Sequence, residues 1–327
     1  MAHEYENLSY DLILTAIERL GLDPSGRILA LNSYENRVFQ IELNEKENII
    51  AKFYRPGRWS DEAILEEHKF SLSLDKNEIP VVAPFEFKNN TMFFYEGFRF
   101  ALFPSRGGRV PNLENMNNLQ WIGRLIGRIH LMGENNPYEF RHKLDSKSFG
   151  WSAREAVLKG NLLPDECRQE YEEISEQLIK STETIFKEIK PKYIKLHGDC
   201  HPGNILWTGM GPHFIDMDDG CNGPAVQDLW MLLNGNKDEI KKQILSLIDG
   251  YESFFVFNKA ELNLIEALRS LRQLHYSGWI TKRWGDPAFP LAFPWYTERS
   301  FWQGYISDLK IQQSSLDRQI SGCIDLF

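Results

Sequence analysis

The sequence predicts an α+β fold of two lobes, an antiparallel-sheet lobe followed by a mainly helical lobe. Runs typical of β-strands dominate residues 28–103, and apolar residues at helical spacing dominate from residue 119 onward. Between them, the segment Pro104-Ser105-Arg106-Gly107-Gly108 marks a Gly-rich change in composition. We therefore expect an N-terminal lobe of residues 1–104 and a C-terminal lobe of residues 105–327.

Composition narrows the class of protein. The 327 residues are 42% hydrophobic and 25% charged, as in ordinary globular proteins. The net charge of −9 argues against nucleic acid or an anionic membrane as the main partner. The sequence contains neither a run of about 18 apolar residues nor a signal-peptide pattern. Its four cysteines form no C-x-x-C pair, which favours reduced thiols. We expect a cytoplasmic monomer.

The elements of the N-terminal lobe follow from periodicity and from turn residues. Helices are expected at about 11–20, ending at Gly21, and at 61–74. Strands are expected at 28–32, 37–43, 49–54, 91–95 and 98–103. The turn Ser33-Tyr34-Glu35-Asn36 joins the first two strands and contains no glycine. It reads equally well as a plain hairpin turn or as a loop whose N–H groups and Ser33 hydroxyl donate to phosphates.

The second lobe contains the two stretches that we expect to form the functional site, residues 196–207 and 213–219. In each stretch an apolar run ends on an acidic residue that a turn follows. Asp199 and Asn204 match the spacing D-x-x-x-x-N, in which the Asp accepts a hydroxyl proton and the Asn holds a metal ion. Asp216 then takes the place of a second metal-binding and catalytic carboxylate. Phosphoryl transfer from ATP with Mg2+ requires such a set.

Other interpretations of these residues remain open. Asp199 can be a helix N-cap, and residues 216–219 can be a solvated turn. His197, Asp199 and His201 alternate as on one strand face and could bind zinc, although Pro202 and Gly203 argue against a continuing strand. We expect the thiol of Cys200 to be buried and inert.

Residues of the first lobe gain roles beside this motif. Lys52 is the one lysine of an apolar strand; it is an ordinary surface residue on its own and a phosphate ligand in a kinase. A glutamate of the following helix would pair with it, and we prefer Glu67 to Glu66 because Glu67 lies on the inward side of that helix. Backbone groups near Ala101 to Phe103 would bind adenine.

The helical part of the chain offers further candidates. Helices are expected at 119–132 and 166–189, with His130 a core histidine. The lysines that follow the second helix form a solvated face that could attract an acidic partner. Asp228 either caps a helix or hydrogen-bonds the 197–204 loop. Aromatic residues are dense from Tyr276 to Tyr305, and the Pro-rich loop 285–296 is a candidate wall of the acceptor site.

The sequence resembles the aminoglycoside phosphotransferase and choline kinase superfamily, a branch of the protein-kinase-like fold. The resemblance lies in Lys52, Glu67, the motif H-G-D-x-H-x-x-N at 197–204 and Asp216. Longer stretches are similar to one subgroup of bacterial stress-response kinases, and they cover residues 31–37, 52–56, 65–68, 222–235 and 286–290. The resemblance implies an ATP- and Mg2+-dependent Ser/Thr protein kinase. It implies Asp199 as base, Asn204 and Asp216 as metal ligands, and Lys52 and Ser33 at ATP.

The resemblance to ordinary protein kinases is incomplete. Only 12 positions separate Asp216 from Asp228, A-P-E is missing, and Asp216-Met217-Asp218 replaces D-F-G. Regulation by a phosphorylated activation loop is therefore not expected. A small-molecule acceptor such as an amino alcohol stays open, and a nucleotide-binding scaffold without catalysis is a third possibility.

Overall fold

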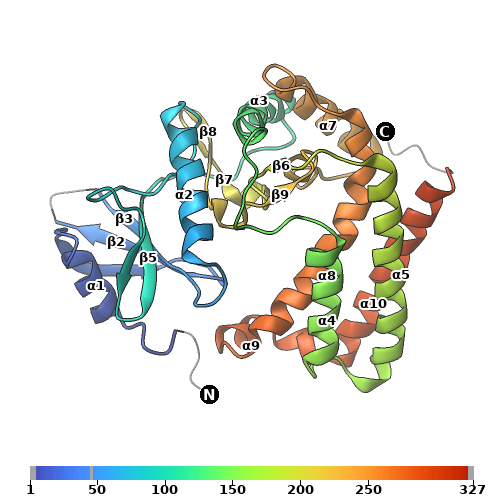
Figure 1. The fold of residues 1–327 in the computed structure, drawn as a ribbon, viewed down its shortest axis with the longest axis horizontal. Coiled ribbons are helices and arrows are strands. Elements are labelled where there is room, and N and C mark those ends of the chain that lie inside the picture. Colours follow the sequence, from blue (N-terminus) through green and yellow to red (C-terminus); the bar gives the residue numbers. More distant parts are fainter. Residues whose placement is uncertain (1–4, 45–46, 323–327) are drawn as a thin grey trace.

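The structure is a computed structural model that describes residues 5–44 and 47–322, so Cys323 lies outside the described residues. Its elements form the predicted two-lobed α+β fold, with the sheet lobe separate from the large helical lobe (Figure 1). The first lobe contains α1 (Tyr10–Glu18), β1 (Pro24–Ala30), β2 (Arg37–Leu43), β3 (Ile49–Phe53), α2 (Asp61–Lys76), β4 (Phe93–Tyr95) and β5 (Phe98–Pro104).

The five strands of the first lobe form one antiparallel sheet in the order β1-β2-β3-β5-β4. Successive side chains of a strand point to opposite faces. In β3, Ala51 and Phe53 therefore join the core that α1 covers, whereas Tyr54 packs with Ile64 of α2. The same alternation turns Lys52 toward α2 and away from the first core. Its register opposite Val38 and Ala101 places it in the middle of the sheet.

The second lobe is mostly helical and carries two short two-stranded sheets. Its α-helices are α3 (Met116–Gly133), α4 (Ser152–Lys159), α5 (Asp165–Ile189), α6 (Gln227–Trp230), α7 (Lys237–Tyr251), α8 (Ile265–Arg283), α9 (Ala288–Ala292) and α10 (Arg299–Ile320). The strand pairs are β6 (Ile194–Lys195) with β9 (Asn222–Gly223), and β7 (Ile205–Thr208) with β8 (Gly211–Phe214). The loops after β6 and β8 carry the predicted motif.

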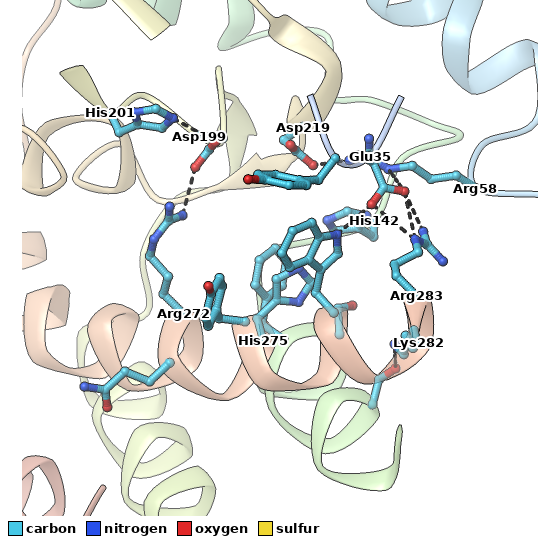
Figure 2. Close-up of a pocket in the computed structure, with 18 of the residues that line it drawn as sticks. Glu35, Arg58, His142, Asp199, His201, Asp219, Arg272, His275, Lys282 and Arg283 are labelled. Carbon is cyan, nitrogen blue, oxygen red and sulfur yellow. Dashed lines mark hydrogen bonds and ion pairs between the residues drawn. The ribbon is translucent and has the colours of Figure 1, made fainter. Parts of the chain in front are cut away.

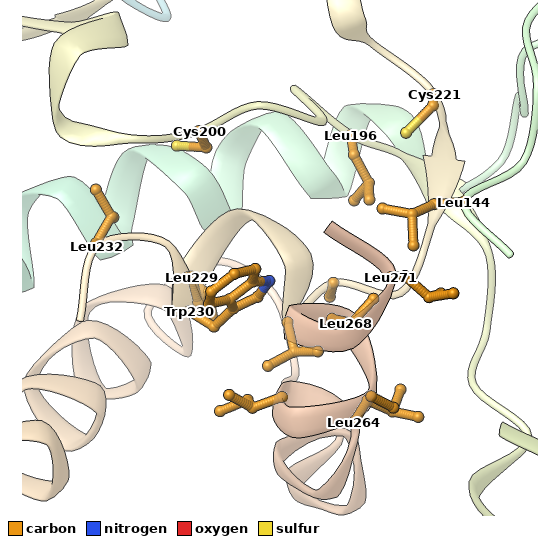
Figure 3. Close-up of a cluster of buried hydrophobic side chains, with 14 of the residues drawn as sticks. Leu144, Leu196, Cys200, Cys221, Leu229, Trp230, Leu232, Leu264, Leu268 and Leu271 are labelled. Carbon is orange, nitrogen blue, oxygen red and sulfur yellow. The ribbon is translucent and has the colours of Figure 1, made fainter. Parts of the chain in front are cut away.

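A hydrophobic cluster supports these loops from below (Figure 3). Leu196 and Cys200 of the first loop are fully buried, and Leu229, Leu268 and Leu271 from α6 and α8 belong to the same core. Burial raises the pKa of the Cys200 thiol well above its usual value. This agrees with the expectation that Cys200 is an inert core residue.

Two element predictions need correction. The first strand is β1 at Pro24–Ala30, earlier than the expected 28–32, because it pairs with β2 from Pro24 onward across an irregularity. Residues 285–296 are not a loop; they contain α9 and the short 3-10 helix Pro294–Thr297. The helix forms because Phe289 and Phe293 become buried in an aromatic cluster, which outweighs the prolines as breakers.

In the part of the chain that the structure describes, no helix combines the length and the apolar character needed to cross a membrane.

We predict that Gly127→Ala destabilises the packing of α3 against α7. A Cβ at Gly127 would lie 2.6 Å from the carbonyl oxygen of Tyr251, so the two helices would have to separate. Overpacking of this kind costs about 1–3 kcal/mol of unfolding free energy, which thermal unfolding would register as a lower Tm. Gly304→Ala in α10 is the matched control, since nothing lies within 4 Å of that Cβ. It should raise stability by about 0.5–1 kcal/mol. A stabilised Gly127 variant would contradict the close contact.

We also predict that Glu261→Gln changes how stability depends on pH. Burial raises the pKa of Glu261 to about 7, although its carboxylate accepts a hydrogen bond from the Val226 N–H at 3.1 Å. A raised folded-state pKa stabilises the fold at acidic pH, and this contribution is lost as pH rises from about 4.5 to 7.

Glutamine keeps an oxygen for Val226 and cannot ionise. The variant should therefore gain up to about 3 kcal/mol over the wild type at pH 8 and little at pH 4.5. Chemical unfolding at both pH values measures this difference. A difference that is equal at the two pH values would show that Glu261 does not titrate in this range.

Candidate active site

One buried carboxylate, that of Asp228 in α6, fixes the loop after β6 through hydrogen bonds to its backbone. Oδ2 of Asp228 accepts from the backbone N–H of His197 at 2.7 Å and its Oδ1 from that of Gly198 at 2.9 Å. The ring of His130 contacts Asp228 at 3.0 Å and the hydroxyl of Tyr251 at 2.9 Å. Asp228 therefore orients the loop and caps no helix, and His130 is the expected core histidine.

Asp199 leaves this loop with its carboxylate partly open to solvent. Its Oδ1 accepts from Arg272 of α8 at 2.8 Å, and its Oδ2 lies 3.5 Å from Nε2 of His201 (Figure 2). Burial alone would raise the pKa of Asp199, but the charges of Arg272 and His201 hold it below its usual value. Asp199 is thus kept ionised, as a proton acceptor must be.

Asn204 connects Asp199 to the second loop of the motif. Its Nδ2 donates to the carbonyl oxygen of Asp199 at 2.9 Å, and its own carbonyl accepts from the N–H of Ile215 at 3.0 Å. These bonds use the side-chain Nδ2 and the backbone carbonyl of Asn204, and its side-chain Oδ1 takes part in neither of them. Asp216 has a left-handed backbone (φ 60°), a strained conformation that residues at functional sites often adopt.

Lys52 reaches across from the sheet lobe to this second loop. Its Nζ lies 2.6 Å from Oδ1 of Asp216 and 3.7 Å from Oδ1 of Asp218. Burial by itself would lower the pKa of Lys52, but Asp216, Asp218 and Glu67 raise it above its ordinary value. The structure therefore brings Lys52, Asp199, Asn204 and Asp216 together from one strand and two loops.

The expected ion pair between Lys52 and a glutamate of α2 is not formed. Lys52 pairs with Asp216 instead, because that carboxylate lies closer to the ammonium group. Of the two candidates, Glu67 is buried near Lys52 and accepts from Ser71 at 2.6 Å. Glu66 points elsewhere and accepts from the N–H groups of Glu139 and Phe140. Glu67 thus acts on Lys52 through its charge and without direct contact.

The other two predicted nucleotide residues have different environments. Ser33 lies half-buried in the β1–β2 turn, where the expected phosphate loop would be. Phe103 lies within β5, opposite Ile50 of β3. The neighbouring Leu102 carbonyl accepts from Phe85, so alternation directs the Phe103 backbone toward β3 and into the sheet. Its ring packs near α2, edge-on to His68. The expected adenine contact of Phe103 therefore does not fit this geometry.

A buried carboxylate that we did not predict, Asp218, binds the two lobes together. It accepts from Asn36 Nδ2 at 2.9 Å and pairs with Arg58, both from the sheet lobe. Its Oδ1 has no hydrogen-bond partner among the described residues and faces Lys52. The sequence suggested a solvated turn here, and only the unusual D-M-D order could have indicated a special role.

A second set of charges fixes the turn that contains Ser33. Glu35 accepts from Trp279 Nε1 at 2.6 Å and pairs with Arg283 at 2.7 Å, both at the end of α8. Asp286 accepts from Arg55 at 2.8 Å and from Arg37 at 2.7 Å. We call the contacts of Glu35 and Asp286 the turn clamp; it joins the β1–β2 turn to the second lobe.

A cavity of about 1000 Å³ opens beside Asp199 (Figure 2). Helix α8 forms one wall with Arg272, His275, Tyr276, Trp279 and Lys282. The rest of the lining comes from the 142–152 segment, the β1–β2 turn, Arg58 and Trp59, the two motif loops and Trp230. Asp199 lines the cavity, whereas Lys52, Asn204 and Asp216 do not.

The Pro-rich segment 285–296 does not line this cavity, contrary to the sequence-based expectation. Its Phe289 and Phe293 rings pack against Tyr34 at 6.3 and 5.3 Å between centroids, behind the cavity wall. Tyr276 and Trp279, earlier in the same aromatic stretch, are the residues that face the cavity. The segment supports the β1–β2 turn because its apolar rings are buried there.

The zinc alternative does not fit either. Nε2 of His197 donates to the Ile215 carbonyl at 2.9 Å, and Nδ1 of His201 accepts from Gly203 at 3.0 Å. Within residues 5–44 and 47–322 no group of three His, Cys, Asp or Glu side chains could hold a metal ion. The two residues predicted as metal ligands, Asn204 and Asp216, carry side-chain oxygens, which are the ligand type that Mg2+ prefers.

Comparison with known proteins identifies the family of the chain. Residues 27–275 match the model of the phosphotransferase enzyme family. Stress response kinase A of Escherichia coli K12 is 40% identical over 301 residues, covering 92% of this chain and 91% of the relative. Serine/threonine protein kinase RdoA of Salmonella typhimurium LT2 is 40% identical over 308 residues, 92% of each chain. The solved amicoumacin kinase hAmiN shares the fold, with a TM-score of 0.71, 16% identity and 93% coverage of both chains.

The family match over residues 27–275 and the two-lobed fold define a kinase-like phosphotransferase. The chain belongs to the phosphotransferase enzyme family, and the resemblance to stress-response kinases is confirmed at the level of sequence.

We predict that Asp286→Asn weakens the turn clamp. The change removes the buried charge that Arg55 and Arg37 share, which should cost about 3 kcal/mol of unfolding free energy. Because the clamp positions the β1–β2 turn, the apparent KM for ATP should also rise several-fold. Glu42→Gln is the matched control, since its pair with Arg27 is exposed and should contribute less than about 1 kcal/mol. Equal effects of the two changes would contradict the role of the clamp.

Proposed function

We propose that this chain is an ATP- and Mg2+-dependent kinase that phosphorylates Ser or Thr hydroxyls of a protein in a bacterial stress response. The observation that carries the proposal is the convergence of Asp199, Asn204, Asp216 and Lys52 from separate segments. The name of the Salmonella relative supports Ser/Thr specificity, and the relatives' names support the stress response. We place the activity in the cytoplasm and in a monomer.

In the proposed reaction, the acceptor hydroxyl oxygen attacks the γ-phosphorus of ATP. A new O–P bond forms, the bond from the γ-phosphorus to the bridging oxygen breaks, and ADP leaves with that electron pair. Asp199 takes the hydroxyl proton, since its carboxylate is ionised and open to the cavity. Asn204 Oδ1 and Asp216 would hold Mg2+, which neutralises phosphate charge when bound.

Lys52 would bind phosphate oxygens from the sheet side, while Asp216 keeps it in place. Ser33 and the N–H groups of its turn would cover the phosphates. The Phe103 backbone is engaged in the sheet, so we move the proposed adenine contact to the segment that begins at Pro104-Ser105, where β5 ends. Here the connection to the second lobe begins.

A small hydroxylated metabolite is the second candidate acceptor. The cavity beside Asp199 supports it, because about 1000 Å³ is at the upper end of the range for small-molecule sites. The solved kinase of the same fold acts, by its name, on the small molecule amicoumacin, but at 16% identity it indicates only the fold.

We predict that Asp199→Asn abolishes transfer and spares nucleotide binding. The purified chain would be incubated with Mg2+, γ-labelled ATP and a generic Ser/Thr protein. Label on protein should fall by at least about 100-fold in the variant, since general-base catalysis contributes on that order. The ATP affinity should change little, because Asp199 lies on the cavity side of the site.

Asp216→Ala is the companion variant and should weaken Mg2+-ATP binding as well as transfer, because it removes a proposed metal ligand. Protein label that persists without the Asp199 carboxylate would refute its role as base. Transfer to a metabolite pool alone would favour the second candidate. Tight ATP binding with no transfer at all would indicate a nucleotide-binding scaffold.

A further inference from the structure

The cavity beside Asp199 is cationic, although the chain as a whole carries a net charge of −9. Its lining contains three acidic residues, Glu35, Asp199 and Asp219. Against them stand six basic residues, which are Arg58, Lys147, Arg269, Arg272, Lys282 and Arg283. The formal surplus of three positive charges is therefore a local feature of this cavity.

Each of the three carboxylates has a basic partner within the protein. Asp199 pairs with Arg272, Glu35 with Arg283, and Asp219 with Arg58, which also pairs with Asp218. Of the other three basic residues, Arg269 pairs with Glu266, and the ammonium groups of Lys147 and Lys282 are left over. Neither Lys147 nor Lys282 makes an ion pair with an Asp or Glu of the described residues, and Lys282 only donates to the Ser152 hydroxyl at 3.0 Å. Such groups favour an anion that enters the cavity.

Two of the histidines that line the cavity, His142 and His275, have tilted ring contacts with Phe149, with centroids 5.3 and 4.3 Å from its ring. Burial, followed by the nearby charges of Arg141 and Arg58, lowers the pKa of His142 to about 4. Burial and then His142, Lys282, Arg272 and Arg58 lower the pKa of His275 to about 3. Both rings are therefore neutral at pH 7 and add no charge.

The remaining wall is aromatic, with Tyr34, Trp59, Phe149, Trp230, Tyr276 and Trp279 in the lining. A cationic amino alcohol would gain from aromatic faces but would meet the uncompensated ammonium groups at close range. The side chains proposed to bind phosphate, Lys52 and Ser33, do not line this cavity, although Tyr34 and Glu35 of the same turn do. Lys147 and Lys282 belong to neither the sheet lobe nor that turn, so the proposed ATP site does not account for them.

We propose that this cavity selects an anionic acceptor, one whose reacting hydroxyl is flanked by carboxylate or phosphate groups that Lys147 and Lys282 bind. The inference rests on the proposed function, since it names the acceptor class of that same site. Two sources share this chemistry, a Ser-containing peptide with acidic neighbours and a small phosphorylated metabolite. The peptide agrees with the Ser/Thr specificity proposed above, and the test separates the two.

The test compares three peptides that differ only around one Ser, with Asp, Ala or Lys flanks, and adds glycerol 3-phosphate beside glycerol. Phosphoryl transfer from Mg2+-ATP is measured as kcat/KM. The Asp-flanked peptide should exceed the Ala peptide by at least about tenfold, and Lys147→Glu/Lys282→Glu should remove that preference. Lys187→Glu/Lys241→Glu is the matched control; both lysines are exposed on other helices and the net charge changes equally.

The outcomes distinguish the inference from the function. Preference for glycerol 3-phosphate with no peptide transfer supports the anionic class with a metabolite as its source. Transfer that requires Asp199 but favours the Ala or Lys peptide overturns the inference and leaves the kinase intact. Equal losses in the two double variants also overturn it, because total charge would then be the cause.

If no acceptor is phosphorylated, the proposed function fails. A binding measurement then tests whether the cavity selects anions. Quenching of the cavity tryptophans, Trp59, Trp230 and Trp279, reports ligand entry without catalysis. Binding of the Asp peptide or glycerol 3-phosphate at least about tenfold tighter than its neutral counterpart, lost in Lys147→Glu/Lys282→Glu, supports an anion site. Equal binding of charged and neutral probes overturns it.

Discussion

The interaction on which the site depends is the buried contact of Lys52 with Asp216 and Asp218 across the two lobes. A lysine buried in a sheet is stable only beside negative charge, and in this structure the two carboxylates nearest to it belong to the other lobe, while Glu67 of α2 adds charge from the same lobe. Asp218 is held in turn by Arg58 and Asn36. Movement of the sheet lobe away from the second loop would therefore break the contacts of Lys52 with both carboxylates and those of Asp218 with Arg58 and Asn36.

This network suits phosphoryl transfer because the same groups that close the lobes would bind the nucleotide. Nζ of Lys52 lies 2.6 Å from Oδ1 of the half-exposed Asp216. In the proposed complex, a phosphate oxygen would bind Lys52 and a metal ion would bind Asp216, beside this ion pair or in place of it. Asp228 meanwhile fixes the loop of Asp199 by two buried N–H bonds that need no nucleotide. The proposed base, Asp199, is thus preorganised, whereas Lys52 and Asp216 would change their contacts when the nucleotide binds.

The features that the sequence could predict are those that depend on local residue patterns. The alternating run 37–43 became β2 with the expected bounds, and the D-x-x-x-x-N spacing placed Asp199 and Asn204 in one short loop. Contacts between distant segments escaped prediction. Asn36 and Asp218 are 182 positions apart, and Arg272 lies 73 positions from Asp199. No periodicity encodes such pairs, since they depend on how the lobes dock.

The aromatic residues from Tyr276 to Phe293 have two different roles, which depend on how the two lobes dock. The first of them lie on α8, where Tyr276 and Trp279 face the cavity. Phe289 and Phe293 instead bury themselves against Tyr34 and so help Asp286 hold the β1–β2 turn. One wall of the cavity and the support of the β1–β2 turn are therefore built from consecutive parts of one segment. Trp279 joins them directly, because it lines the cavity and donates to Glu35 of that turn.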